Sequence, residues 1–96
     1  DSKKLSAAVR QEFSEEIRAH ACWAIGEACH EEINSINIVQ ASFLAMRRAY
    51  ESMCKNFEVS IGLALIDGHL APPFPCPVKP IVKGDSKSVS IAAASI

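Results

Sequence analysis

The chain has 96 residues, 49% of them apolar, and ten basic and eleven acidic side chains give a net charge of −1. A chain of this length is one small domain that has enough apolar residues for a core but buries only about 60–65% of its unfolded surface. The near-neutral charge excludes a strongly cationic arm that binds bare phosphate. No apolar run is long enough to span a membrane.

The cysteines indicate a reducing compartment. None of the four forms a Cys-x-x-Cys pair, so they are expected to be reduced thiols that pack as small apolar residues in a cytoplasmic protein. The alternative is a zinc site built on Cys29-His30 with one more cysteine, although the spacing is not that of a zinc motif. The four are Cys22, Cys29, Cys54 and Cys76.

The first predicted element is an amphipathic helix over residues 6–20. Ser6 is a suitable N-cap, because its hydroxyl can accept a hydrogen bond from a backbone N–H of the first turn. An apolar stripe at i, i+4 and i+8 faces the core and consists of Val9, Phe13 and Ile17. Residues 21–29 follow as a predicted strand, because Trp23 and Ile25 alternate with small residues.

A long helix is predicted next, from its N-cap Asn37 to about Cys54, after a short helical turn over residues 31–35. Its sequence carries two adjacent apolar faces, which predict burial over much of the helix circumference. One face has Phe43, Met46, Tyr50 and Met53, and the other has Ile38, Ala41, Ala45 and Ala49.

Residues 61–67 are predicted to form a buried strand, because a continuous apolar run that ends in a carboxylate suits a strand covered on both faces. Residues 68–80 hold all five prolines and are predicted to be an irregular connection. A short strand over residues 78–82 is expected at a sheet edge, since Pro80 has no N–H to donate.

The last predicted elements are a polar turn over residues 83–86 and a helix that starts near Ile91, capped by Ser88 or Ser90. Helices therefore alternate with strands along the chain. This order indicates an α/β domain.

Asp67 is the strongest candidate site residue. It ends an apolar strand and precedes Gly68, and ligands of open α/β sheets gather beyond the carboxyl ends of strands. A carboxylate there suits a hard metal ion, although an ordinary turn Asp is the alternative. Asp85, at another turn, can share divalent cations with it in a two-metal site, while Lys83 meets a phosphate or neutralises Asp85. His69 either reaches this site or is a surface residue.

Five segments of the sequence form a pattern by their order and spacing. They are Asp1-Ser2-Lys3-Lys4-Leu5-Ser6, Asn37-Ile38 followed by Ala41 and Ala45-Met46, Leu65-Ile66-Asp67-Gly68, Val82-Lys83-Gly84-Asp85-Ser86, and Ser90-Ile91-Ala92-Ala93-Ala94-Ser95-Ile96. Together they resemble bacterial ribonuclease HII over essentially the whole chain.

The resemblance implies a type 2 ribonuclease H with an RNase H-like three-layer α/β fold. Such enzymes cut the RNA strand of RNA/DNA hybrids, and cut beside ribonucleotides misplaced in a DNA duplex, with Mn²⁺ or Mg²⁺ as cofactor. The resemblance maps the third and fourth of the family's four catalytic, metal-binding carboxylates onto Asp67 and Asp85. It also implies that Lys3, Lys4 and Lys83 lie near the phosphates of the nucleic acid.

The family's first two carboxylates lie in an Asp-Glu-x-Gly-Arg-Gly motif that this sequence does not contain. Residues 1–96 are therefore expected to be a single partial catalytic domain, truncated at both ends and without the family's C-terminal helices, from a cytoplasmic and monomeric parent enzyme. The chain alone is expected to be inactive. The alternatives are a non-catalytic RNase H-like module that binds nucleic acid or protein, and a structural fragment without activity.

Overall fold

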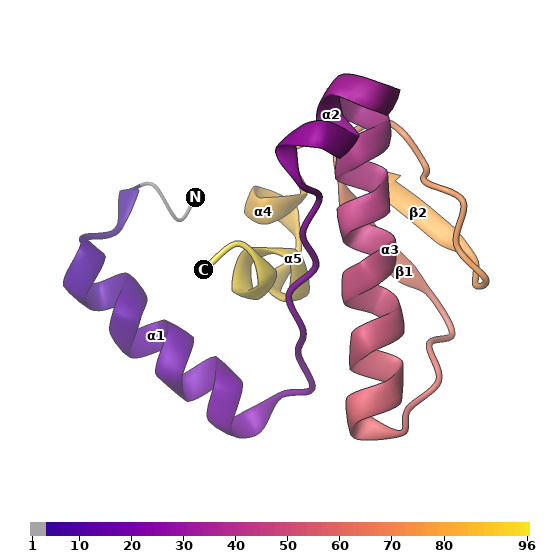
Figure 1. Ribbon diagram of the computed structural model, residues 1–96. Coiled ribbons are helices and arrows are strands. Elements are labelled where there is room, and N and C mark those ends of the chain that lie inside the picture. Colours follow the sequence, from indigo (N-terminus) through magenta and orange to yellow (C-terminus); the bar gives the residue numbers. More distant parts are fainter. Residues whose placement is uncertain (1–3) are drawn as a thin grey trace.

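The structure is a computed structural model that describes residues 4–96. Helices and parallel strands are mixed, as the sequence predicts. In Figure 1, α3 stands upright, with the two strands to its right and with α4, α5 and α1 to its left. α4 contacts both strands, and α5 contacts β1. The elements are α1 (Ala7–His20), α2 (His30–Ile36), α3 (Ile38–Phe57), β1 (Ala64–Asp67), β2 (Val78–Ile81), α4 (Gly84–Lys87) and α5 (Val89–Ala94).

The predicted helix starts are confirmed, because each depends on a local hydrogen bond. The Ser6 hydroxyl accepts from the Val9 N–H at 3.2 Å and caps α1. The Asn37 side-chain oxygen accepts from the Gln40 N–H at 3.1 Å and caps α3. Of the two serines proposed for the last helix, Ser88 is the cap.

The strand predicted over residues 21–29 is wrong. The segment is irregular and runs along α3 (Figure 1), and it has no neighbouring strand within the described part of the chain. Gly26 accounts for this path. A Cβ at Gly26 would lie 1.9 Å from the Ala45 carbonyl oxygen and 2.5 Å from the Ala49 nitrogen, so the backbone lies directly on the helix.

The two strands pair in parallel, with Ala64 opposite Val78 and Asp67 opposite Ile81. β2 confirms the short strand predicted around Pro80, which is tolerated because β2 has a partner on one side only. β1 is shorter than the predicted strand over residues 61–67. It is also not covered on both faces, because its apolar residues are half-buried in a sheet of two edge strands.

The predicted polar turn at residues 83–86 is the single helical turn α4. Lys83 precedes it in the left-handed conformation, with φ 54° and ψ 42°. The turn closes through the Ser86 N–H, which donates to the Lys83 carbonyl at 3.0 Å. α5 follows directly, so that β2, α4 and α5 form one continuous unit.

The core of the described chain is thin. Its buried residues are Ala41, Pro72, Gly84 and Ile91. The prediction that α3 is buried over much of its circumference is wrong, because only Ala41 of this helix is buried and Ile38 is 61% exposed. One face lies against the 21–29 segment, and the ring centres of Tyr50 and Phe74 lie 5.3 Å apart, so these contacts leave much of the helix half-buried or exposed. The radius of gyration, 13.9 Å, exceeds the about 12.5 Å of a compact domain of this length.

Candidate functional site

Asp67 is the last residue of β1, at the carboxyl edge of the parallel pair. Its side chain is exposed, and the backbone turns away at once through Gly68, whose φ of 142° is open to glycine but strained for other residues. The Gly68 N–H still donates to the Ile81 carbonyl at 3.0 Å, so the ladder continues to the point where the carboxylate leaves the sheet. Asp67 therefore stands on a fixed strand end.

Asp85 reaches the same edge from β2. The chain leaves Ile81 opposite Asp67 and enters α4 two residues after β2 ends, where Asp85 is the second helical residue. The Gly84 N–H donates to Asp67 Oδ1 at 2.9 Å. One hydrogen bond thus ties the strand end that carries Asp67 to Gly84, the residue directly before Asp85. Asp85 itself is half-buried.

The chemistry of this edge suits a divalent cation. Carboxylate oxygens are the ligands that Mg²⁺ and Mn²⁺ prefer. Gly84 occupies Oδ1 of Asp67, and no described residue donates a hydrogen bond to Oδ2. Within residues 4–96 no three His, Cys, Asp or Glu side chains gather closely enough to hold a metal ion by themselves. The two carboxylates therefore do not complete a metal site within the described residues, and a cation at this edge would need further ligands.

The predicted basic residues are placed unequally. Lys83 is exposed and lies in the turn between β2 and Asp85, so it belongs to the same edge as the carboxylates. Lys4 is exposed ahead of α1, in another part of the fold. Lys3 lies outside the described residues. His69 is exposed in the loop after β1. The nucleic-acid contacts of the three lysines stay a prediction.

The thiols do not form the alternative zinc site within the described residues. All four cysteines are free, and Cys22 and Cys29 are exposed. Cys29 has a structural task instead, because it is the N-cap of α2. Its backbone N–H donates to Glu32 Oε1 at 3.0 Å.

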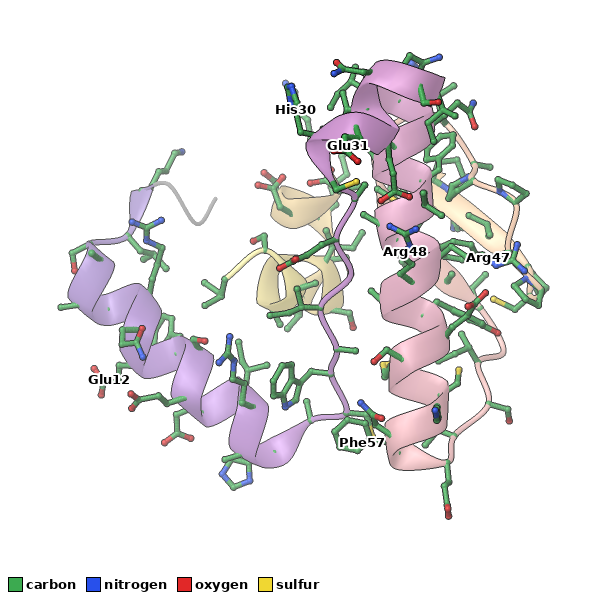
Figure 2. The ribbon with its side chains drawn as sticks, in the orientation of Figure 1. Glu12, His30, Glu31, Arg47, Arg48 and Phe57 are labelled. Atoms are coloured by element: carbon green, nitrogen blue, oxygen red, sulfur yellow. The ribbon has the colours of Figure 1, made fainter. Side chains whose placement is uncertain are left out.

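A second charged cluster, which the sequence did not reveal, is structural. The Arg48 guanidinium makes a bidentate ion pair with the Glu32 carboxylate, with N–O distances of 2.7 and 2.6 Å. It also donates to the Glu27 carbonyl at 2.8 Å. Figure 2 shows Arg47 and Arg48 pointing to opposite sides of α3, with Arg47 toward the loop before β2. Arg48 and the Cys29 N–H lower the pKa of Glu32 from 4.5 to about 2. Glu32 is at N3 of a capping box, but the sequence pattern of a capping box has Ser or Thr at the N-cap, where this chain has Cys29.

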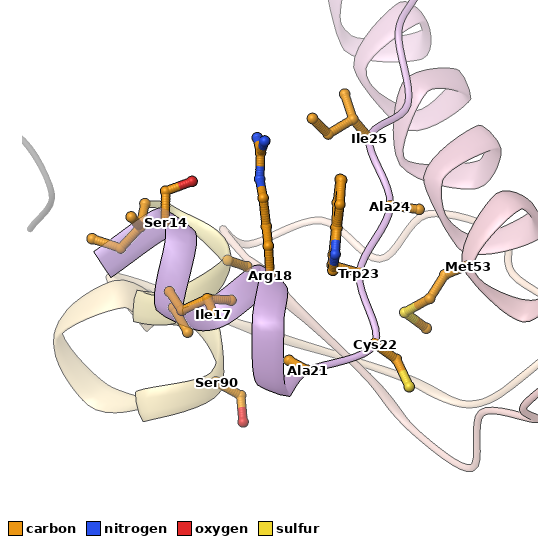
Figure 3. Close-up of a pocket in the computed structure, with 13 residues that line it drawn as sticks. Ser14, Ile17, Arg18, Ala21, Cys22, Trp23, Ala24, Ile25, Met53 and Ser90 are labelled. Atoms are coloured by element: carbon orange, nitrogen blue, oxygen red, sulfur yellow. The ribbon is translucent and has the colours of Figure 1, made fainter. Parts of the chain in front are cut away.

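A cavity of about 610 Å³ lies between the end of α1, the 21–29 segment and α5. The Arg18 guanidinium lies 4.7 Å from the centre of the Trp23 ring, and Figure 3 shows the two stacked side chains at the cavity wall. A cation on an aromatic face is a stabilising contact. The cavity is separate from the carboxylate edge, because neither Asp67 nor Asp85 lines it.

Three curated proteins to which this chain is similar are all named ribonuclease HII. Ribonuclease HII of Paramagnetospirillum magneticum is 51% identical over 96 residues, that of Caulobacter vibrioides 53% over 97 residues, and that of Polynucleobacter necessarius 47% over 97 residues. Each alignment covers all of this chain. The chain belongs to the ribonuclease HII family.

The resemblance predicted from the five sequence segments is thereby confirmed. The chain spans 46%, 44% and 49% of the length of those three relatives. No protein-family profile matches it. Across residues 4–96 no helix is both long enough and apolar enough to cross a membrane.

Proposed function

We propose that this chain supplies part of the divalent-metal site of an endoribonuclease with an RNase H-like three-layer fold. The enzyme hydrolyses the RNA strand of RNA/DNA hybrids and cuts beside ribonucleotides misplaced in DNA. The observation that carries the proposal is the 2.9 Å hydrogen bond from the Gly84 N–H to Asp67, because it joins two carboxylate-bearing segments at the carboxyl edge of a parallel sheet. The family of ribonucleases HII supports the same chemistry.

The cofactor in this proposal is Mn²⁺ or Mg²⁺. When bound, the metal activates a water molecule and stabilises the leaving oxygen of the phosphodiester. Asp67 and Asp85 hold the metal, and the exposure of Asp67 leaves its free oxygen accessible. The family resemblance supplies two further carboxylates, from the Asp-Glu-x-Gly-Arg-Gly motif, to complete the ligand set.

The proposed partners are an RNA/DNA hybrid or a DNA duplex that contains ribonucleotides, and the proposed parent is a monomeric cytoplasmic enzyme. Lys3, Lys4 and Lys83 contact phosphates in this proposal. The exposure of Lys83 beside Asp85 supports its part.

The test replaces each carboxylate by its amide in the intact protein. Asp67→Asn keeps an oxygen that can accept from the Gly84 N–H, so the fold should persist while the charge that a metal needs is lost. Cleavage of a DNA duplex with one ribonucleotide, in Mn²⁺, should fall by orders of magnitude. Asp85→Asn should be damaging as well.

Glu12→Gln is the matched control, because it removes one carboxylate charge from the exposed surface of α1 (Figure 2) and should leave cleavage normal. Near-normal turnover in Asp67→Asn would remove this residue from the site. An intact protein that binds hybrid in Mn²⁺ and cleaves nothing would support the non-catalytic module instead.

A further inference from the structure

We infer that Gly84 is a positioning residue: its backbone N–H fixes one oxygen of Asp67 and so presents the other oxygen to a divalent cation, and Ile91 of α5 holds Gly84 in place. The inference rests on the proposed function of Asp67. It assigns a role to two residues that carry no metal-binding or charged group.

The donor and the acceptor of this hydrogen bond differ in their exposure to solvent. Gly84 is buried, whereas Asp67 is exposed. Water therefore has little access to the donor, while the acceptor carboxylate keeps its second oxygen open. A hydrogen bond to an ionised carboxylate is stronger than one between neutral groups. The Gly84 N–H consequently restrains the rotation of the Asp67 carboxylate without blocking Oδ2.

Steric fit, and not backbone conformation, explains why glycine stands at this position. A Cβ on Gly84 would lie 2.6 Å from the Cδ1 atom of Ile91, 3.4 Å from the Cβ atom of Ile81 and 3.5 Å from the Cα atom of Asp67. Any larger residue must therefore push α4 away from β1 or displace Ile91. Ile91 is only 6% exposed, so its side chain must repack within the interior to make room.

Both backbone polar groups of Gly84 are hydrogen-bonded. Its N–H is bound to Asp67, and its carbonyl oxygen accepts from the Ser88 N–H at 2.8 Å. Lys83 enters the turn in the left-handed conformation, which directs the following N–H back toward β1. The position of α5, through Ile91 and Ser88, therefore determines where the Gly84 N–H meets the carboxylate.

The direct test replaces the N–H by an oxygen atom, which cannot donate a hydrogen bond. Gly84 is replaced by glycolic acid in the intact protein, which turns its backbone amide into an ester and leaves the shape unchanged. Mn²⁺ affinity is measured by calorimetry without nucleic acid. Loss of a group that orients a metal ligand should weaken affinity by about tenfold. The control is the corresponding ester at Ala21, made with lactic acid, because it deletes the hydrogen bond that the Ala21 N–H donates to the Ile17 carbonyl at the end of α1 and leaves the partners of Asp67 in place.

The Gly84 ester should bind Mn²⁺ about tenfold more weakly, and the Ala21 ester should bind it normally. Equal affinity of the Gly84 ester and the unmodified protein, or an equal loss in both esters, overturns the inference. Asp67→Asn separates the two hypotheses. If that variant loses Mn²⁺ affinity while the Gly84 ester does not, only the positioning role fails. If Asp67→Asn changes neither affinity nor cleavage, the proposed function fails.

A compensating pair tests the contact with Ile91. Gly84→Ala places a methyl group 2.6 Å from Cδ1 of Ile91 and should weaken Mn²⁺ binding. Adding Ile91→Val removes that Cδ1 atom, so the double variant should recover most of the affinity lost by Gly84→Ala. A double variant that binds Mn²⁺ as weakly as Gly84→Ala overturns the role of Ile91.

Discussion

Gly26→Ala is expected to damage this fold more than any exposed glycine replacement. The added Cβ would lie 1.9 Å from the Ala45 carbonyl oxygen, and ordinary contact begins at 3.4 Å, so the segment and α3 must separate by about 1.5 Å. The atoms it meets belong to a helix backbone and cannot rotate away. The same shift pulls the Glu27 carbonyl out of reach of Arg48, which donates to it at 2.8 Å.

The two effects set the magnitude. Overpacking costs about 1–3 kcal/mol, so Gly26→Ala should destabilise the protein by at least about 1–3 kcal/mol, and loss of the exposed hydrogen bond from Arg48 adds to that cost. Gly62→Ala is the matched control. A Cβ at Gly62 meets nothing within 4 Å, and reduced freedom of the unfolded chain should make this change neutral or stabilising by up to about 1 kcal/mol.

Urea unfolding of the intact protein measures both variants, since a shift in midpoint at constant slope reports stability. Gly26→Ala should unfold at clearly lower urea than Gly62→Ala. Equal stability of the two variants, within about 0.5 kcal/mol, would refute the close approach of the 21–29 segment to α3.

The remaining predictions concern charge and the isolated chain. Because the folded pKa of Glu32 is about 2 against 4.5, its contribution is complete above pH 4.5 and is lost as the pH falls toward 2; the stability difference between wild type and Glu32→Gln, measured by urea titration, should shrink over that window. A difference independent of pH would contradict the ion pair with Arg48. Lys83→Asn keeps a residue that tolerates the left-handed conformation and should lower the salt slope of hybrid binding by about one; an unchanged slope returns Lys83 to the solvated surface. The 96-residue chain alone should melt without cooperativity and should not cleave hybrid in Mn²⁺, because its core is thin and it carries only two of the proposed ligands; cleavage that Asp67→Asn abolishes, with a cooperative melt, would contradict this.

Local interactions made much of the fold predictable. The caps Ser6 and Asn37 were found from sequence because the hydrogen bonds they make span three residues. The strand predicted over residues 21–29 is wrong because the alternation of large and small side chains does not show whether a partner strand is present. Gly26 carried the informative signal there, since glycine permits a close backbone approach, but its partner in α3 lies 19 residues or more away and is set by tertiary structure.

The site divides in the same way. Asp67 could be singled out because a carboxylate at the end of an apolar strand follows a general rule of α/β sheets. The donor that holds it could not, since Gly84 contributes a backbone N–H that every non-proline residue has. Its selection depends on the space left by Ile91, which only the packing of α5 defines.

The near-neutral charge of the chain is compatible with the proposed nucleic-acid substrate, because the balance of acidic and basic residues differs between segments. α1 and α2 carry five of the eleven acidic residues, Glu12, Glu15, Glu16, Glu31 and Glu32. The segment from β2 to the end of α4 has Lys79, Lys83 and Lys87, all exposed, and Asp85 as its single acid. At physiological salt an exposed charge acts over about 8 Å, so a phosphate at the carboxylate edge responds mainly to the charged groups of that edge. Local charge, and not net charge, therefore decides whether this edge can approach a phosphodiester, and a bound divalent cation would add to the same positive field.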